Sequence, residues 1–265
     1  MATQKERDVL LARLSENPQT VISIHILKRG NCNVYLSGNS PRYSAAILQA
    51  NDLPSEPTGF GSEANALWQL LTLVRGWECV LVDKACASLL GTIIADRLKK
   101  PVRYLDDVYH VPSGRVFPFD NESVRWLTLN DLALLEAAPS EVQPTGFWGS
   151  LRASLTEGMV AGAVVDGQVV ATAFVAACGE RYADIGVYAL ESFRGRGLAT
   201  AAASIVARSV QNNGLVPVWG CGEHNLPSLR LAKKLGFAEV SRRTYVVIEA
   251  YLADVLRRTY PVAVN

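Results

Sequence analysis

Residues 183–199 constrain the fold more than any other stretch of the chain. The apolar run from Ala183 to Ala189 predicts a strand, and a glycine-rich turn follows it directly before a helix begins. Gly195 and Gly197 let the backbone approach an anion closely, and the helix start directs unpaired N–H groups to the same place. Two flanking arginines add positive charge. The turn is therefore predicted to hold a phosphate group, although such a turn can also be only a tight connection.

A second motif follows one strand later. Residues 216–221 form a short apolar run that predicts a strand, and residues 225–237 then predict a helix with both ends marked. Asn225 is a favourable N-cap, and Gly236 lies where helices commonly stop in the left-handed conformation. Arg-x-x-Gly-x-Ala at 194–199 and Asn-x-x-Ser-x-x-x-Ala-x-x-Leu-Gly-Phe at 225–237 together resemble the two signature blocks of the GCN5-related N-acetyltransferases, the GNAT family. The resemblance covers roughly residues 122–250.

The resemblance implies a fold and a cofactor. The fold would be α+β, with a mixed and mostly antiparallel sheet flanked by helices. The cofactor would be acetyl-CoA, whose thioester carbonyl is attacked by an acceptor amine. The family's binding positions fall here on the turn residues Arg194, Gly195, Arg196, Gly197, Leu198 and Ala199, on the strand end Val187, Tyr188 and Ala189, and on Asn225 and Ser228. Lys233 or Lys234 would reach a phosphate or simply be a solvated helix end.

The catalytic residues are left open. Asp184 occupies the strand position where some family members carry a basic glutamate, and burial there would raise its pKa, which suits a base. It could equally bond a neighbouring loop. Glu223 and His224, just before the N-cap, are the next candidates. Many family members place a thiolate-protonating tyrosine where this chain has Ala232. Ser228, Tyr188 or water would then supply that proton, or the thiolate would leave unassisted, since a thiol with a pKa near 8.5 is a fair leaving group.

The first part of the chain repeats the order of the second. Strands are expected at 21–27, 32–36, 44–49, 78–82 and 102–110, with helices at 5–14, 62–74 and 85–99. An offset of about 136 to 140 residues brings this order onto 159–249 and sets Gly59 and Gly61 opposite the later glycines. We therefore predict two tandem GNAT-like domains, 1–118 and 119–265. The first is degenerate, because its turn has no arginine and no Asn-x-x-Ser block follows.

Composition limits the function classes. Hydrophobic residues make up 49% and charged residues 19% of the 265, with a net charge of +1, so the chain is predicted to be globular and not a nucleic-acid binder. No apolar run is long enough for a membrane span, and the first residues lack a signal-peptide core. The five cysteines are odd in number and scattered, which predicts free thiols, a cytoplasmic location and no metal site.

Three functions follow from the resemblance. The leading one is an acetyl-CoA-dependent N-acetyltransferase acting on a primary amine of a small molecule, by direct attack in a ternary complex. The degenerate first domain would then form part of the acceptor cleft or a dimer face, which leaves a homodimer open. The alternatives are a non-catalytic acyl-CoA-binding or regulatory module and a peptide or protein N-acetyltransferase.

Overall fold

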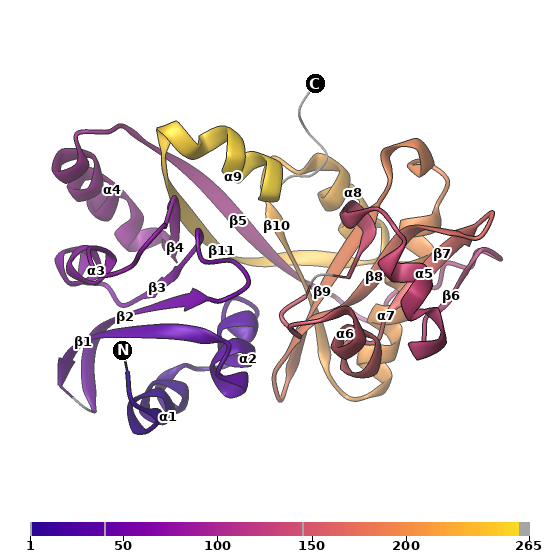
Figure 1. Cartoon of the computed structure of the whole chain (residues 1–265), viewed down its shortest axis with the longest axis horizontal. Helices are drawn as coiled ribbons and strands as arrows, with labels where there is room; N and C mark the ends of the chain where they lie inside the picture. The colour runs from indigo at the N-terminus through magenta and orange to yellow at the C-terminus, as the bar shows by residue number, and fades with distance from the viewer. Residues whose placement is uncertain (1, 40, 145, 260–265) are drawn as a thin grey trace.

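The protein is described by a computed structural model that covers residues 2–39, 41–144 and 146–259. Its strands are β1 Cys32–Asn39, β2 Arg42–Ala50, β3 Thr58–Phe60, β4 Cys79–Asp83, β5 Val102–Pro112, β6 Val124–Trp126, β7 Ala161–Val165, β8 Gln168–Cys178, β9 Tyr182–Ala189, β10 Val216–Gly222 and β11 Phe237–Ile248. They form one sheet in the order β1-β2-β3-β4-β11-β5-β10-β9-β8-β7-β6 (Figure 1). Most neighbours are antiparallel, and β3–β4 and β9–β10 are parallel.

Helices flank the sheet, as the α+β expectation requires. They are α1 Gln4–Arg13, α2 Val21–Arg29, α3 Ala64–Leu71, α4 Lys84–Leu98, α5 Leu132–Glu136, α6 Leu151–Glu157, α7 Leu198–Asn212, α8 Leu226–Lys234 and α9 Leu252–Thr259. Within the described part of the chain, no helix combines the length and the apolar character that a membrane crossing needs.

The two halves of the chain share one order of elements. The first half runs β1, β2, β3, α3, β4, α4, β5, and the second runs β7, β8, β9, α7, β10, α8, β11. In each half three antiparallel strands are followed by a strand parallel to the third. Asp166 and Gly167 form the tight hairpin turn between β7 and β8, and both have positive φ values, 49° and 76°.

The halves exchange their last strands. β11 lies between β4 and β5, so that Tyr245 pairs with Leu81 on one side and with Leu105 on the other. β5 in turn pairs with β10, where Trp219 lies opposite His110. Figure 1 shows the two long strands crossing the middle of the molecule. The sheet is therefore continuous from one half to the other, and the division of the chain at residue 118 stays a prediction.

The strand expected at residues 21–27 is wrong, because these residues form helix α2. Its run of branched apolar residues favours a strand by propensity. In the structure six of the nine helical residues are buried, and the helix packs on β8 and β9 of the second half. A helix buried on most of its surface lacks the polar face that normally reveals it. The local indication of a helix is its C-terminal end, where Lys28 and Arg29 precede Gly30, which has a φ of 69°.

The core of the second half fixes the start of α7. Ala202, Ala203, Val206 and Ala207 are fully buried in one cluster with residues of β8, β9 and β10. Alanine side chains let this helix approach the sheet closely. As a result the N-terminus of α7 is held at the end of β9.

Candidate active site

The parallel strands β9 and β10 separate partway along their length. They pair only from Tyr182 to Asp184 on β9 and from Val216 to Val218 on β10. Beyond these pairs β9 stays with β8 as far as Ala189, while β10 turns to β5. Among the described residues, the edge of β9 after Asp184 therefore has no ladder partner on the β10 side. Such an edge can pair with an extended amide-containing chain.

Two cavities adjoin in the gap between these strands. The turn cavity, of about 820 Å³, is lined by the turn after β9, the start of α7 and one face of α8. The inner cavity, of about 680 Å³, lies on the side of the second half that faces the first. The two share a group of lining residues, namely Val187, Tyr188, Trp219, Asn225 and Ser228. A molecule bound in one cavity can thus meet a molecule bound in the other.

The turn cavity exposes backbone at its centre. Gly195 and Gly197 have φ values of 77° and 78°, and a Cβ added to either would meet no atom within 4 Å. Gly197 is the N-cap of α7, whose first N–H groups have no partner within the helix. Arg194, Gly195, Gly197, Leu198 and Ala199 all line this cavity, as do Val187, Tyr188, Ala189, Asn225 and Ser228. The predicted cofactor residues are therefore brought together, with one exception.

That exception is Arg196. Its guanidinium lies 4.9 Å from the centre of the Phe193 ring and donates to the Ser192 carbonyl at 3.3 Å, and it does not line the cavity. Sequence reasoning missed Arg230, which lines the turn cavity together with Lys234. The two are four residues apart and so share one face of α8, a spacing that could have indicated the pair. Lys233 does not line the cavity.

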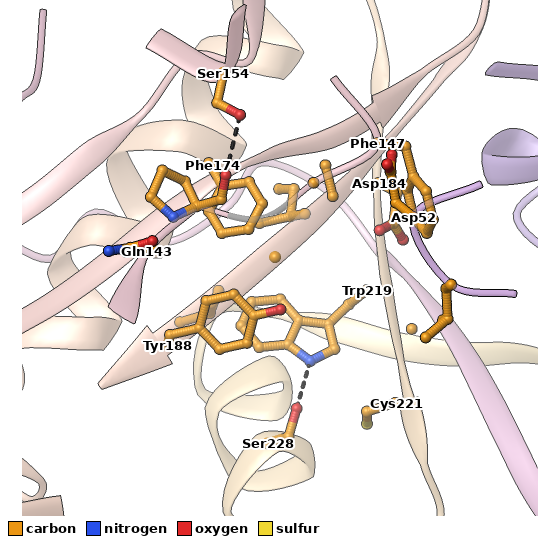
Figure 2. Close-up of a pocket in the computed structure, with 18 of the residues that line it drawn as sticks. Asp52, Gln143, Phe147, Ser154, Phe174, Asp184, Tyr188, Trp219, Cys221 and Ser228 are labelled. Atoms are coloured by element: carbon orange, nitrogen blue, oxygen red, sulfur yellow. Dashed lines mark hydrogen bonds between the residues drawn. The ribbon is translucent and has the colours of Figure 1, made fainter. Parts of the chain in front are cut away.

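The inner cavity is built by both halves. The loop 51–57 of the first half contributes Asp52, Leu53 and Glu56, and β11 contributes Tyr245. Most of the remaining wall comes from β9, β10 and the segment 143–154. Figure 2 shows Phe174, Tyr188 and Trp219 with their rings around the space, and Asp184 at another side of it.

Asp184 is a strongly perturbed carboxyl group in this wall. The residue is 8% exposed, and no hydrogen bond to its carboxylate is found among the described residues. Burial, and then the nearby carboxylate of Asp107, raise the pKa of Asp184 to about 7. A Cβ on Gly220 would lie 3.8 Å from its Oδ1, so the glycine keeps the space beside the carboxylate open. An unpaired carboxylate with this pKa can accept a proton near neutral pH.

Ser228 and Trp219 meet where the cavities adjoin. The Trp219 indole N–H donates to Ser228 Oγ at 2.9 Å, which Figure 2 marks with a dashed line. Asn225 caps α8 by accepting from the Ser228 backbone N–H at 3.2 Å. Cys221 lines the inner cavity beside them, and burial raises the pKa of its thiol to about 11. The thiol therefore stays protonated at neutral pH and is a poor nucleophile.

The other candidate bases lie elsewhere. Glu223 forms an ion pair with Arg242 at 2.9 Å, and the exposed His224 lies 3.7 Å from Glu223. Neither residue lines either cavity. Ala232 is fully buried in the core, so this position offers no proton donor.

The matching turn of the first half is closed. A Cβ on Gly59 would lie 3.0 to 3.2 Å from Val82, Leu67 and Ile47, and one on Gly61 would lie 2.5 Å from the Ser44 carbonyl oxygen. The Gly59 carbonyl also accepts from the buried guanidinium of Arg243. This turn is filled by the protein itself.

Residues 128–247 match the sequence model of the GNAT acetyltransferases. This part of the chain belongs to the GNAT family. The uncharacterized N-acetyltransferase YdfB of Bacillus subtilis (strain 168) is 33% identical over 98 residues. That match covers 37% of this chain and only 38% of YdfB.

Solved GNAT structures resemble the whole fold. The GCN5-related N-acetyltransferase-like protein from Streptococcus suis 89/1591 has a TM-score of 0.67 at 22% identity, covering 92% of this chain and all of that one. A tandem GNAT protein from the clavulanic acid biosynthesis pathway has a TM-score of 0.55 at 12% identity, covering 91% and 94%. At these identities the similarity concerns the fold alone. It confirms the α+β, tandem GNAT-like architecture.

Proposed function

We propose that the protein transfers the acetyl group of acetyl-CoA to a primary amine of a small molecule, in a complex that holds both substrates at once. One observation carries the proposal. The buried, unpaired carboxylate of Asp184 lies in a cavity that adjoins the turn cavity along Val187, Tyr188 and Trp219. A base and a cofactor site are thereby next to each other.

The turn cavity fits a CoA thioester. The open backbone at Gly195 and Gly197 and the first N–H groups of α7 suit a pyrophosphate, and Arg194, Arg230 and Lys234 add positive charge. The unpaired edge of β9 suits the pantetheine amides. When bound there, acetyl-CoA supplies the acetyl carbonyl carbon that bonds to the amine nitrogen as the carbon–sulfur bond breaks.

Asp184 provides the base. An ammonium acceptor loses two protons when it becomes an amide, and Asp184 takes the first of them. With a pKa of about 7, roughly half of the Asp184 population is ionised at neutral pH. The second proton ends on the departing sulfur, since a thiol with a pKa near 8.5 is largely protonated at pH 7. Ser228 and Tyr188, which line both cavities, lie where that proton is needed.

Direct attack is favoured over a covalent route through the protein. Cys221 is the cysteine that lines the inner cavity, and its raised pKa of about 11 leaves very little thiolate at neutral pH. The volume of about 680 Å³ also lies within the ordinary range for small-molecule sites. A small amine therefore suits the site better than a protein surface.

A second function is favoured by Ala232. A fully buried alanine stands where many family members have a thiolate-protonating tyrosine. The lack of this proton donor would suit a protein that binds an acyl-CoA without turning it over. Binding and turnover separate the two functions.

The test has two stages. Thermal-shift measurements with acetyl-CoA and CoA report binding, and a thiol-release assay over a panel of amines reports transfer. We expect acetyl-CoA to raise the melting temperature and at least one small amine to accelerate CoA release. Binding without release from any amine would favour the non-catalytic function, and absence of binding would overturn both.

A further inference from the structure

The charged residues in the described lining of the inner cavity are all acidic. Three carboxylates line it, those of Asp52, Glu56 and Asp184, and none of the described lining residues is Lys, Arg or His. Arg243 lies behind the wall, where its guanidinium donates to the Gly59 carbonyl and approaches Asp83 at 3.4 Å. It offsets part of the negative charge without lining the cavity. A cleft lined by one sign of charge concentrates ligands of the opposite sign.

One of the three carboxylates, Asp184, is the proposed base, and the other two lie on the loop 51–57 of the first half. Asp184 is more than nine-tenths buried, whereas Asp52 is exposed to solvent. The two therefore lie at different depths, one inside and one at the mouth. Asp52 is oriented by the Asn31 side-chain amide, which donates to its Oδ2 at 2.8 Å. Glu56 is buried. Burial is the main cause of the raised pKa values of Asp107 and Tyr245, and the charge of Glu56 adds to both shifts.

Aromatic rings line the space around these carboxylates. Phe147, Phe174, Tyr188, Trp219 and Tyr245 all contribute to the wall. Burial, followed by the charges of Asp107 and Glu56, raises the pKa of Tyr245 well above 10, so its ring carries no negative charge at neutral pH. Aromatic faces attract ammonium groups and also cover hydrocarbon chains. The wall thus suits a ligand with an aliphatic middle and charged ends.

We propose that the acceptor is a small dication, a diamine or polyamine. One primary amine lies at Asp184 and is acetylated, and a second ammonium group is held at the mouth by Asp52 with the added charge of Glu56. This inference rests on the proposed acetyl transfer. It disfavours acceptors with a carboxylate, such as amino acids, because none of the described lining residues is a cation.

Steady-state kinetics with matched amines test the charge requirement. The probes are 1,4-diaminobutane and 1,6-diaminohexane as dications, butylamine as a monocation and 4-aminobutanoate as a zwitterion. We expect a kcat/KM for the better dication at least about tenfold above butylamine, since a charge-assisted contact typically contributes that much. We expect 4-aminobutanoate to be the poorest. Equal or better use of butylamine would overturn the inference.

Asp52→Asn tests the second ammonium site, with Asp120→Asn as its control. Both residues are exposed aspartates, and Asp120 lines neither cavity. Asp52→Asn should raise the KM for the preferred diamine roughly tenfold and change butylamine kinetics much less. Asp120→Asn should change neither. An equal effect of Asp52→Asn on both amines would contradict the assignment.

Calorimetry separates a failure of this inference from a failure of the proposed function. The wild-type protein saturated with CoA is titrated with 1,4-diaminobutane, 1,6-diaminohexane and butylamine, so the readout needs no turnover. We expect tighter binding of a dication, weakened by added salt. A separate titration measures acetyl-CoA binding. If acetyl-CoA binds and the monoamine is preferred, only the inference falls. If acetyl-CoA does not bind, the proposed function falls as well.

Discussion

The two adjoining cavities differ in which part of the chain builds them and in their charge. The described lining of the turn cavity comes entirely from residues 141–234, with Arg194, Arg230 and Lys234 beside a helix start. Part of the wall of the inner cavity comes from the loop 51–57 of the first half, and its lining includes three carboxylates. The contrast teaches that the turn cavity is a local construction of the GNAT region. The inner cavity is completed only where the two halves meet.

Removing the charge of Asp184 should give the largest difference between an effect on the inner cavity and an effect on the turn cavity. Asp184→Asn is expected to lower turnover by roughly 10²–10⁴-fold, the usual contribution of a general base, because the amine keeps its proton. Acetyl-CoA affinity, measured by calorimetry, should stay near wild type. In the wild type kcat/KM should rise with pH and level off above about pH 7, following the pKa of Asp184. Unchanged turnover, with loss of turnover in Glu223→Gln, would move the base to the other loop.

The same substitution should alter the pH dependence of stability. The Asp184 carboxyl loses its proton near its ordinary pKa of 3.8 when unfolded and at about 7 when folded, so its ionisation costs stability as pH rises through this window. Between pH 5 and pH 8, the free energy of unfolding of the wild type should fall by roughly 2–3 kcal/mol relative to that of Asp184→Asn. Denaturant unfolding at several pH values measures the difference. A difference in free energy of unfolding that does not change with pH would show that the pKa of Asp184 is not raised.

Gly197→Val should weaken binding in the turn cavity alone. Valine at a φ of 78° strains the backbone, and its side chain enters the space above the first N–H groups of α7. We expect acetyl-CoA affinity to fall roughly tenfold or more. Gly214→Val is the matched control, because Gly214 has the same φ of 78° and the same open surroundings but lines neither cavity. Equal losses of affinity in both variants would point to general destabilisation.

Loosening the contact between the halves should affect only the inner cavity. The neutral ring of His25 donates from Nε2 to the Phe147 carbonyl and accepts at Nδ1 from the Cys178 N–H, each at 3.2 Å, and burial lowers its pKa. His25→Gln loses at least one of these bonds, so the acceptor KM should rise about fivefold while acetyl-CoA affinity holds. The exposed His224→Gln is the control. A matching loss of acetyl-CoA affinity would contradict the separation of the cavities.

The sequence predicted the turn cavity well because its determinants are local. Gly195, Gly197 and the cap at Asn225 mark a strand–turn–helix unit whose geometry follows from neighbouring residues. Asp184 could be named for the same reason, since it precedes that turn on one strand. Whether it is the base remains a prediction.

The rest depends on contacts between distant segments. Nothing in the local pattern of β11 indicates that it lies between β4 and β5, and only this exchange brings Tyr245 to the cavity. Asp52 and Glu56 belong to a loop whose composition is ordinary for a turn. The sequence predicts a strand at residues 21–27 because helix α2, which is buried between the halves, has no polar face.

A crystal structure of the protein with acetyl-CoA tests the division between the cavities most directly. We predict the pyrophosphate at the backbone of 195–199, the pantetheine along the edge of β9, and the acetyl group between Tyr188, Trp219 and Ser228, opening toward Asp184. Cofactor bound at the turn of the first half, or an acetyl group directed away from the inner cavity, would contradict the account.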